Sequence, residues 1–187
     1  MVYGAINEKG ESYYTYLGKV FDAMGGRQKD YNWLITDCEC YPMDPKAEAM
    51  LRGDSCWISG EALTALVERE NFQWIWAVLS GFDKHVSLRE VLAHPLPYAD
   101  GYPGFWRLPL TMQHPLAQVE IVAWDSSLTL CQRRMVKNLK RRPENDPNAG
   151  NIALVIYAGT LSAGQLSAGS SAGGTGWTPA FHRSLSR

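Results

Sequence analysis

The sequence lacks any long hydrophobic run and any recognisable leader, and these absences exclude two classes of protein. Its first eight residues, MVYGAINE, have neither the basic start nor the apolar stretch of a secretory signal peptide. No apolar segment approaches the length that a bilayer-spanning helix requires. We therefore expect a soluble cytoplasmic protein with no membrane partner.

Glycine-rich phosphate loops are also missing. Gly25-Gly26 is not followed by the Lys-Ser/Thr pair of a nucleotide-binding loop. The segment 101–104 contains Pro103, which has no amide proton to donate to a phosphate. The sequence therefore argues against nucleotide hydrolysis, and we expect no cofactor.

Cysteine is scarce, and its spacing does not suggest a metal site. The four residues are Cys38, Cys40, Cys56 and Cys131, which we expect to be thiols in a reducing compartment. Cys38 and Cys40 are too close in sequence to pair readily on an extended strand. A Cys-x-Cys pair followed sixteen residues later by a lone cysteine matches no common structural zinc pattern. We expect no metal, and packed thiols instead.

Acidic residues almost disappear after residue 130. Residues 1–130 contain 17 acidic and 10 basic residues, a net charge of −7, whereas residues 131–187 contain 2 acidic and 8 basic residues, a net charge of +6. Such asymmetry favours a charged partner or, in the basic part, nucleic acid, although solvated charge without a partner is more common.

The chain of 187 residues is 45% hydrophobic, with 7 Trp, 9 Tyr and 5 Phe, enough for one sizeable core.

The hydrophobic pattern predicts short strands and short helices in irregular order. Strands are expected at 2–6, 31–41, 56–59, 72–79, 119–124 and 128–131, and helices at 13–24, 45–51, 61–69 and 87–93. Ser12 can cap the first helix and Gly25-Gly26 can end it, and Ser87-Leu88-Arg89-Glu90 has the spacing of a capping box. The almost unbroken apolar run at 72–79 favours a strand covered on both faces, at the centre of a sheet. Without a regular βαβ rhythm, the pattern predicts an α+β fold, a mixed and largely antiparallel sheet with short helices packed on it.

Three regions follow from this pattern. Residues 1–130 form a single globular α+β domain. Residues 131–159 hold a basic helix over 133–142 and a possible extra strand at 152–157. Residues 160–187 are rich in Ser, Ala and Gly and nearly repeat Leu-Ser-Ala-Gly, so we expect them to be mobile unless docked, because small side chains bury too little surface.

The segment 98–107 (YADGYPGFWR) is the strongest candidate for a binding surface. It interleaves aromatic side chains with an acid and a base, a mixture typical of protein interfaces. The candidate binding residues are Tyr98, Asp100, Tyr102, Phe105, Trp106 and Arg107. The alternative is a loop held onto the core by Tyr102, Phe105 and Trp106, and the sequence leaves both possibilities open.

A catalytic site is the weaker alternative, and we predict no catalytic residue. Cys38 or Cys40 could act as a nucleophile only with a nearby base, and nothing in the sequence places His85, His94 or His114 beside them. Asp37 and Asp125 both follow expected strands, where two carboxylates could act as acid and base. Aspartate is also common in turns for structural reasons, and that interpretation is favoured.

Three segments carry a weak resemblance to known proteins: WISG at 57–60, WAVLSGF at 76–82 and VEIVAWDSS at 119–127. They resemble segments of small bacterial domains of unknown function, some of which are immunity or antitoxin proteins. The resemblance covers residues 1–130 and identifies no catalytic position. Such domains are expected to end in an acidic helix, whereas this chain turns basic.

The leading hypothesis is therefore a noncatalytic bacterial protein that binds another protein, an immunity-type partner of a basic toxin such as a nuclease. A small Cys- or Asp-based hydrolase, with its site near Asp37, Cys38 and Asp125, is the second hypothesis. Nucleic-acid binding through 133–142 is the third, and the acidic domain disfavours it.

Overall fold

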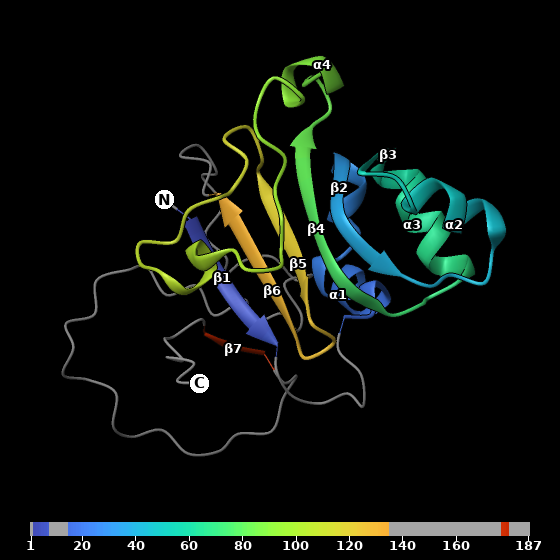
Figure 1. The fold of residues 1–187 in the computed structure, drawn as a ribbon, viewed down its shortest axis with the longest axis horizontal. Helices are drawn as coiled ribbons and strands as arrows, with labels where there is room; N and C mark the ends of the chain where they lie inside the picture. Colours follow the sequence, from blue (N-terminus) through green and yellow to red (C-terminus); the bar gives the residue numbers. More distant parts are fainter. Residues whose placement is uncertain (1, 8–14, 135–176, 180–187) are drawn as a thin grey trace.

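The computed structural model describes residues 2–7, 15–134 and 177–179 (Figure 1). In these ranges the strands form one sheet in the order β3-β2-β4-β5-β6-β1-β7, and every pairing is antiparallel. The strands are β1 (Val2–Asn7), β2 (Tyr31–Cys40), β3 (Ser55–Ser59), β4 (Trp74–Asp83), β5 (Val119–Trp124), β6 (Leu128–Arg134) and β7 (Trp177–Pro179). The helices are α1 (Leu17–Met24), α2 (Pro45–Leu51), α3 (Gly60–Arg69) and α4 (Leu88–Val91), with 3-10 turns η1 (Arg27–Asp30) and η2 (Pro103–Trp106). The predicted α+β fold is confirmed.

Helices α1, α2 and α3 cover one face of the sheet. Alternate residues of β5, including Ile121, pack in a core that also contains Leu17 of α1 and Leu63 of α3. Trp33 of β2 lies in the same core and is fully buried. Figure 1 shows α1, α2 and α3 gathered on one side of the sheet.

The chain between β4 and β5 covers the opposite face. Val122 of β5 and Val78 of β4 pack against Phe105 of η2, and Phe82 packs with Val91 of α4. The prediction that the 72–79 run is buried on both faces is therefore confirmed, and β4 lies inside the sheet between β2 and β5. We call residues 95–118 the cover segment and residues 98–107 within it the aromatic loop.

Helix α1 begins at Leu17, four residues later than predicted. Tyr16 is extended and forms an isolated antiparallel bridge with Gln73. Thr15 before it has a left-handed φ of 63°, and its hydroxyl lies 2.5 Å from that of Thr129. Residues 8–14, with the predicted N-cap, lie outside the described residues. The helix ends as predicted at a glycine, Gly25, with a left-handed φ of 61°.

Strand β6 extends beyond its predicted end. It continues to Arg134, so Arg133 and Arg134 are strand residues where the sequence predicts the start of a basic helix. Close to the C-terminus, the short strand β7 (Trp177–Pro179) pairs with β1. The rest of the predicted helix, the strand at 152–157 and most of the tail lie outside the described residues.

No helix within the described ranges is both long enough and apolar enough to cross a lipid bilayer.

Candidate functional site

The rings of the aromatic loop form a connected set of edge-to-face contacts. The Tyr98 and Tyr102 rings lie 5.3 Å apart, and those of Tyr102 and Phe105 lie 4.8 Å apart. Both Phe105 and Trp106 then meet Trp124 at the end of β5, at 5.7 and 5.3 Å. Each such pair stabilises by about 0.5–1.5 kcal/mol beyond the area that it buries. The loop is therefore packed onto the sheet.

The same loop also presents side chains to solvent. Phe105 is only 2% exposed, whereas Tyr98 is 47% exposed and the neighbouring Leu108 is 65% exposed. Asp100 and Arg107 are exposed, and Tyr102 and Trp106 are half-buried. Phe105 therefore anchors the loop to the core, and Tyr98, Asp100 and Arg107 face solvent. Binding through these exposed residues stays a prediction.

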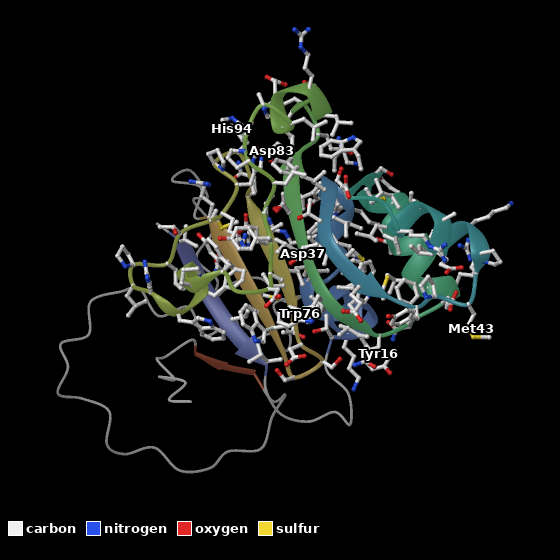
Figure 2. The ribbon with its side chains drawn as sticks, in the orientation of Figure 1. Tyr16, Asp37, Met43, Trp76, Asp83 and His94 are labelled. Atoms are coloured by element: carbon white, nitrogen blue, oxygen red, sulfur yellow. The ribbon has the colours of Figure 1, made fainter. Side chains whose placement is uncertain are left out.

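Asp37 fixes the start of the aromatic loop. One of its carboxylate oxygens, Oδ2, accepts the backbone N–H groups of Ala99 at 2.6 Å and Asp100 at 3.0 Å. The Asp37 backbone has a left-handed φ of 49°, which aspartate tolerates better than most residues. Figure 2 labels Asp37 near the centre of the view, above Trp76. Asp37 and the aromatic loop, which the sequence assigns to separate candidate sites, are therefore joined.

Replacing Asp37 by alanine is expected to loosen the aromatic loop. The two N–H groups would lose a charged acceptor, and alanine would be strained at a positive φ. We expect hydrogen exchange at the Ala99 and Asp100 amides to accelerate at least about tenfold. Asp37→Asn keeps one oxygen acceptor and should give a smaller acceleration. Unchanged exchange at both amides in Asp37→Ala would show that this carboxylate does not hold the loop.

Glu120 fixes the end of the cover segment from inside the sheet. It is fully buried on the face that the cover segment overlies. Its two carboxylate oxygens accept the backbone N–H groups of Gln113 at 3.0 Å and His114 at 2.9 Å. The Gln113 side chain in turn bonds both the N–H and the carbonyl of Tyr98. One buried carboxylate is thus connected through a glutamine to the aromatic loop.

Burial raises the pKa of Glu120 above its ordinary value of 4.5, because removing the carboxylate from water disfavours its charged form. The His114 and Gln113 N–H groups, the positive charge of Arg134 and the Ser80 hydroxyl act in the opposite direction. Arg134 also donates to the carbonyls of Ala117 and Pro115, at 3.1 and 3.0 Å. This arginine is therefore engaged in holding the cover segment.

His114 is a structural histidine. It is fully buried, its Nε2 lies 3.0 Å from the Val91 carbonyl, and its Nδ1 accepts the Leu116 N–H at 3.2 Å. These contacts require a neutral ring with the proton on Nε2. Burial lowers the pKa of His114, in agreement with that state. The ring packs edge-to-face on Phe82 and His94.

The residues of the catalytic alternative are not brought together with a base. In the part of the chain that the structure describes, no histidine hydrogen-bonds a cysteine; the Cys38 and Cys40 sulfurs contact each other at 3.5 Å. Asp125 has a φ of 47° and lies in the turn between β5 and β6, whereas Asp37 holds the cover segment. Within the same ranges, no group of three or more His, Cys, Asp or Glu residues is arranged to hold a metal ion.

An open groove of about 480 Å³ lies between α1, η1 and α3. Its rim carries charges of both signs, including Asp22, Lys29 and Glu68. Asn71, also on its wall, accepts the Gly18 N–H at 3.0 Å. None of the candidate binding or catalytic residues that the sequence indicates lines this groove.

Sequence reasoning missed Glu120, Gln113 and Arg134, although one signal was present. Glu120 is the single charge in the apolar segment 119–124, which forms a strand covered on both faces. A charge at such a position requires buried partners. The sequence does not indicate the partners of Glu120, because Gln113 and His114 lie in the cover segment, which has no hydrophobic periodicity.

No protein-family model, curated protein or solved structure matches this chain.

Proposed function

We propose that the protein acts by binding another protein through the aromatic loop, as an immunity-type or antitoxin-type partner does. One observation supports this proposal above the others: the packed loop holds Tyr98, Asp100 and Arg107 exposed to solvent. Half-buried Tyr102 and Trp106 lie in the same loop. Tyr, Trp and Arg are the side chains that most often dominate binding energy at interfaces. A loop already held in place loses little conformational entropy on binding.

The charge around the loop supports a basic partner. Asp37 and Asp100 are both exposed and adjacent, because the Asp100 N–H donates to the Asp37 carboxylate. Residues 1–130 carry a net charge of −7. A negative surface accelerates association with a positively charged protein and discriminates against acidic ones. We therefore propose that the target presents basic side chains, as a nuclease toxin does.

Affinity capture followed by a binding measurement tests this proposal. The tagged full chain would be used to capture proteins from its native host, and the captured protein would then be purified and titrated. The double variant Tyr98→Ala/Arg107→Ala is expected to bind at least about tenfold more weakly, because these exposed side chains supply contact area and directed hydrogen bonds. Affinity should also fall as salt is added.

Met43→Ala is the matched control. Met43 is 89% exposed and lies at the far side of the molecule from the aromatic loop (Figure 2). Its loss should change the affinity by less than about twofold. Equal affinity of the wild type and the Tyr98/Arg107 variant, or capture of no protein by the wild type, would contradict the proposal.

A further inference from the structure

Two sulfur atoms at the end of β2 lie within reach of each other. The Sγ atoms of Cys38 and Cys40 are 3.5 Å apart, and both residues are half-buried against the core on the helix-covered face. A disulfide requires a separation of about 2.05 Å, so bond formation needs an approach of about 1.5 Å. The reactive groups are therefore already close to one another.

A regular strand would hinder this pairing, and β2 is irregular here. Residues two apart on a strand are separated by about 6.6 Å at their Cα atoms, near the upper limit for a disulfide. The register between β2 and β4 shifts between Thr36 and Glu39 and again between Glu39 and Cys40. Asp37 adds a left-handed φ of 49° at the same place. A bulge bends the strand and interrupts its ladder, which removes the restraint that an extended strand would impose.

The surroundings of the two sulfurs are unequal. A hydrogen bond with Cys40 and burial raise the pKa of Cys38, and the neighbouring charges of Cys56 and Asp37 act in the same direction. The hydrogen bond donated by Cys38 lowers the pKa of Cys40. The thiolate is the reactive form of cysteine, so this asymmetry makes Cys40 the expected attacking group and Cys38 the expected resolving group.

We propose that Cys38 and Cys40 form a redox-active dithiol that a small-molecule disulfide, such as oxidised glutathione, converts into an intramolecular disulfide. The Cys40 thiolate attacks one sulfur of the oxidant, whose S–S bond breaks and releases one thiolate that takes up a proton. Cys38 then gives up its proton, and its sulfur attacks Cys40 and expels the second thiolate. One dithiol and one small disulfide become one protein disulfide and two small thiols, with two electrons transferred to the oxidant.

The other two cysteines provide internal comparisons. Burial raises the pKa of Cys131 to about 12 and also raises that of Cys56. A thiol whose pKa is raised is a poor attacking group in neutral solution, because little of it is thiolate. The first attack on the oxidant is therefore expected at Cys40, and ring closure at Cys38, whose sulfur lies beside it.

Mass spectrometry of the full chain after treatment with oxidised glutathione tests the proposal. The wild type is expected to lose two hydrogens and to retain no glutathione. Cys38→Ser should retain one glutathione on Cys40, because no resolving thiol remains. Cys40→Ser should form no protein disulfide and should react at least about tenfold more slowly. Cys131→Ser and Cys56→Ser should behave as the wild type does.

Peptide mapping decides the outcome from the wild type alone, whatever the stability of the variants. A bond between Cys38 and Cys40 supports the proposal. A bond that involves Cys56 or Cys131, a retained glutathione without ring closure, or no reaction at all would overturn it. So would a Cys40→Ser variant that reacts as fast as Cys38→Ser.

Discussion

Replacing Gly60 by alanine is expected to lower the free energy of unfolding by about 4 kcal/mol, a large part of the 5–15 kcal/mol typical of a domain. A Cβ atom at this first residue of α3 would lie 2.1 Å from the Gln28 carbonyl oxygen and 2.7 Å from that of Tyr31. Both are backbone atoms, so neither can swing aside as a side chain would. Either the helix or the start of β2 must move.

The displacement would reach the core. The Gln28 carbonyl that crowds position 60 also accepts the indole N–H of Trp33 at 2.9 Å. Trp33 is fully buried among the residues that join the helices to the sheet. Movement of this carbonyl would therefore break the buried hydrogen bond to Trp33 and disturb the packing of its indole ring in the core.

Urea unfolding followed by circular dichroism measures this effect, with Gly53→Ala as the control. At Gly53 the nearest atom to an added Cβ is the Ser55 carbonyl oxygen at 3.7 Å, an ordinary contact. That variant should remain within about 0.5 kcal/mol of the wild type. A Gly60→Ala protein that unfolds within about 1 kcal/mol of the wild type would show that α3 does not approach η1 as closely as described.

Removing the Glu120 carboxylate is expected to lower the free energy of unfolding by about 2–4 kcal/mol, because Glu120→Leu leaves the Gln113 and His114 N–H groups without an acceptor. Leucine is similar in size, so little of the loss would come from a cavity. Glu120→Gln retains one carbonyl acceptor and should lose less. Urea unfolding at neutral pH distinguishes the three proteins, and a Glu120→Leu protein as stable as the wild type would contradict the assignment.

The raised pKa of Glu120 also predicts the direction in which the free energy of unfolding changes with pH. The folded state raises the pKa of Glu120 above 4.5, so protonation favours folding. Relative to Glu120→Gln, the wild type should gain stability as the pH falls through the raised pKa, and the gain should be complete below about pH 4.5. Because both proteins contain His114, its contribution cancels in the difference. A difference that is flat between about pH 8 and pH 4.5, or that changes in the opposite direction, would contradict the assignment.

Local features of the sequence predicted much of the fold. The Ser87-x-x-Glu90 capping box is present, with both reciprocal hydrogen bonds, and Gly25 ends α1. The apolar run at 72–79 is largely strand and is buried on both faces. These predictions succeed because a helix cap depends on residues within one helical turn, and hydrophobic periodicity depends on residues within one strand or helix.

The contacts that position the candidate site were beyond such reasoning. The carboxylate of Asp37 binds the N–H of Ala99, 62 residues away. The cover segment has no periodicity, so nothing in its sequence indicates which residues of the sheet it will meet. The start of α1 was placed too early for a similar reason, since Tyr16 is held extended by Gln73, far along the chain. Tertiary contacts here override local preference.

Photo-crosslinking from the aromatic loop tests the central claim most directly. A photoreactive benzoylphenylalanine would replace Tyr98 in one protein and Met43 in another, both at exposed positions. Illumination with the captured partner is predicted to give a covalent product from position 98 and none from position 43. A product from position 43 alone, or equal products from both, would contradict binding through the aromatic loop.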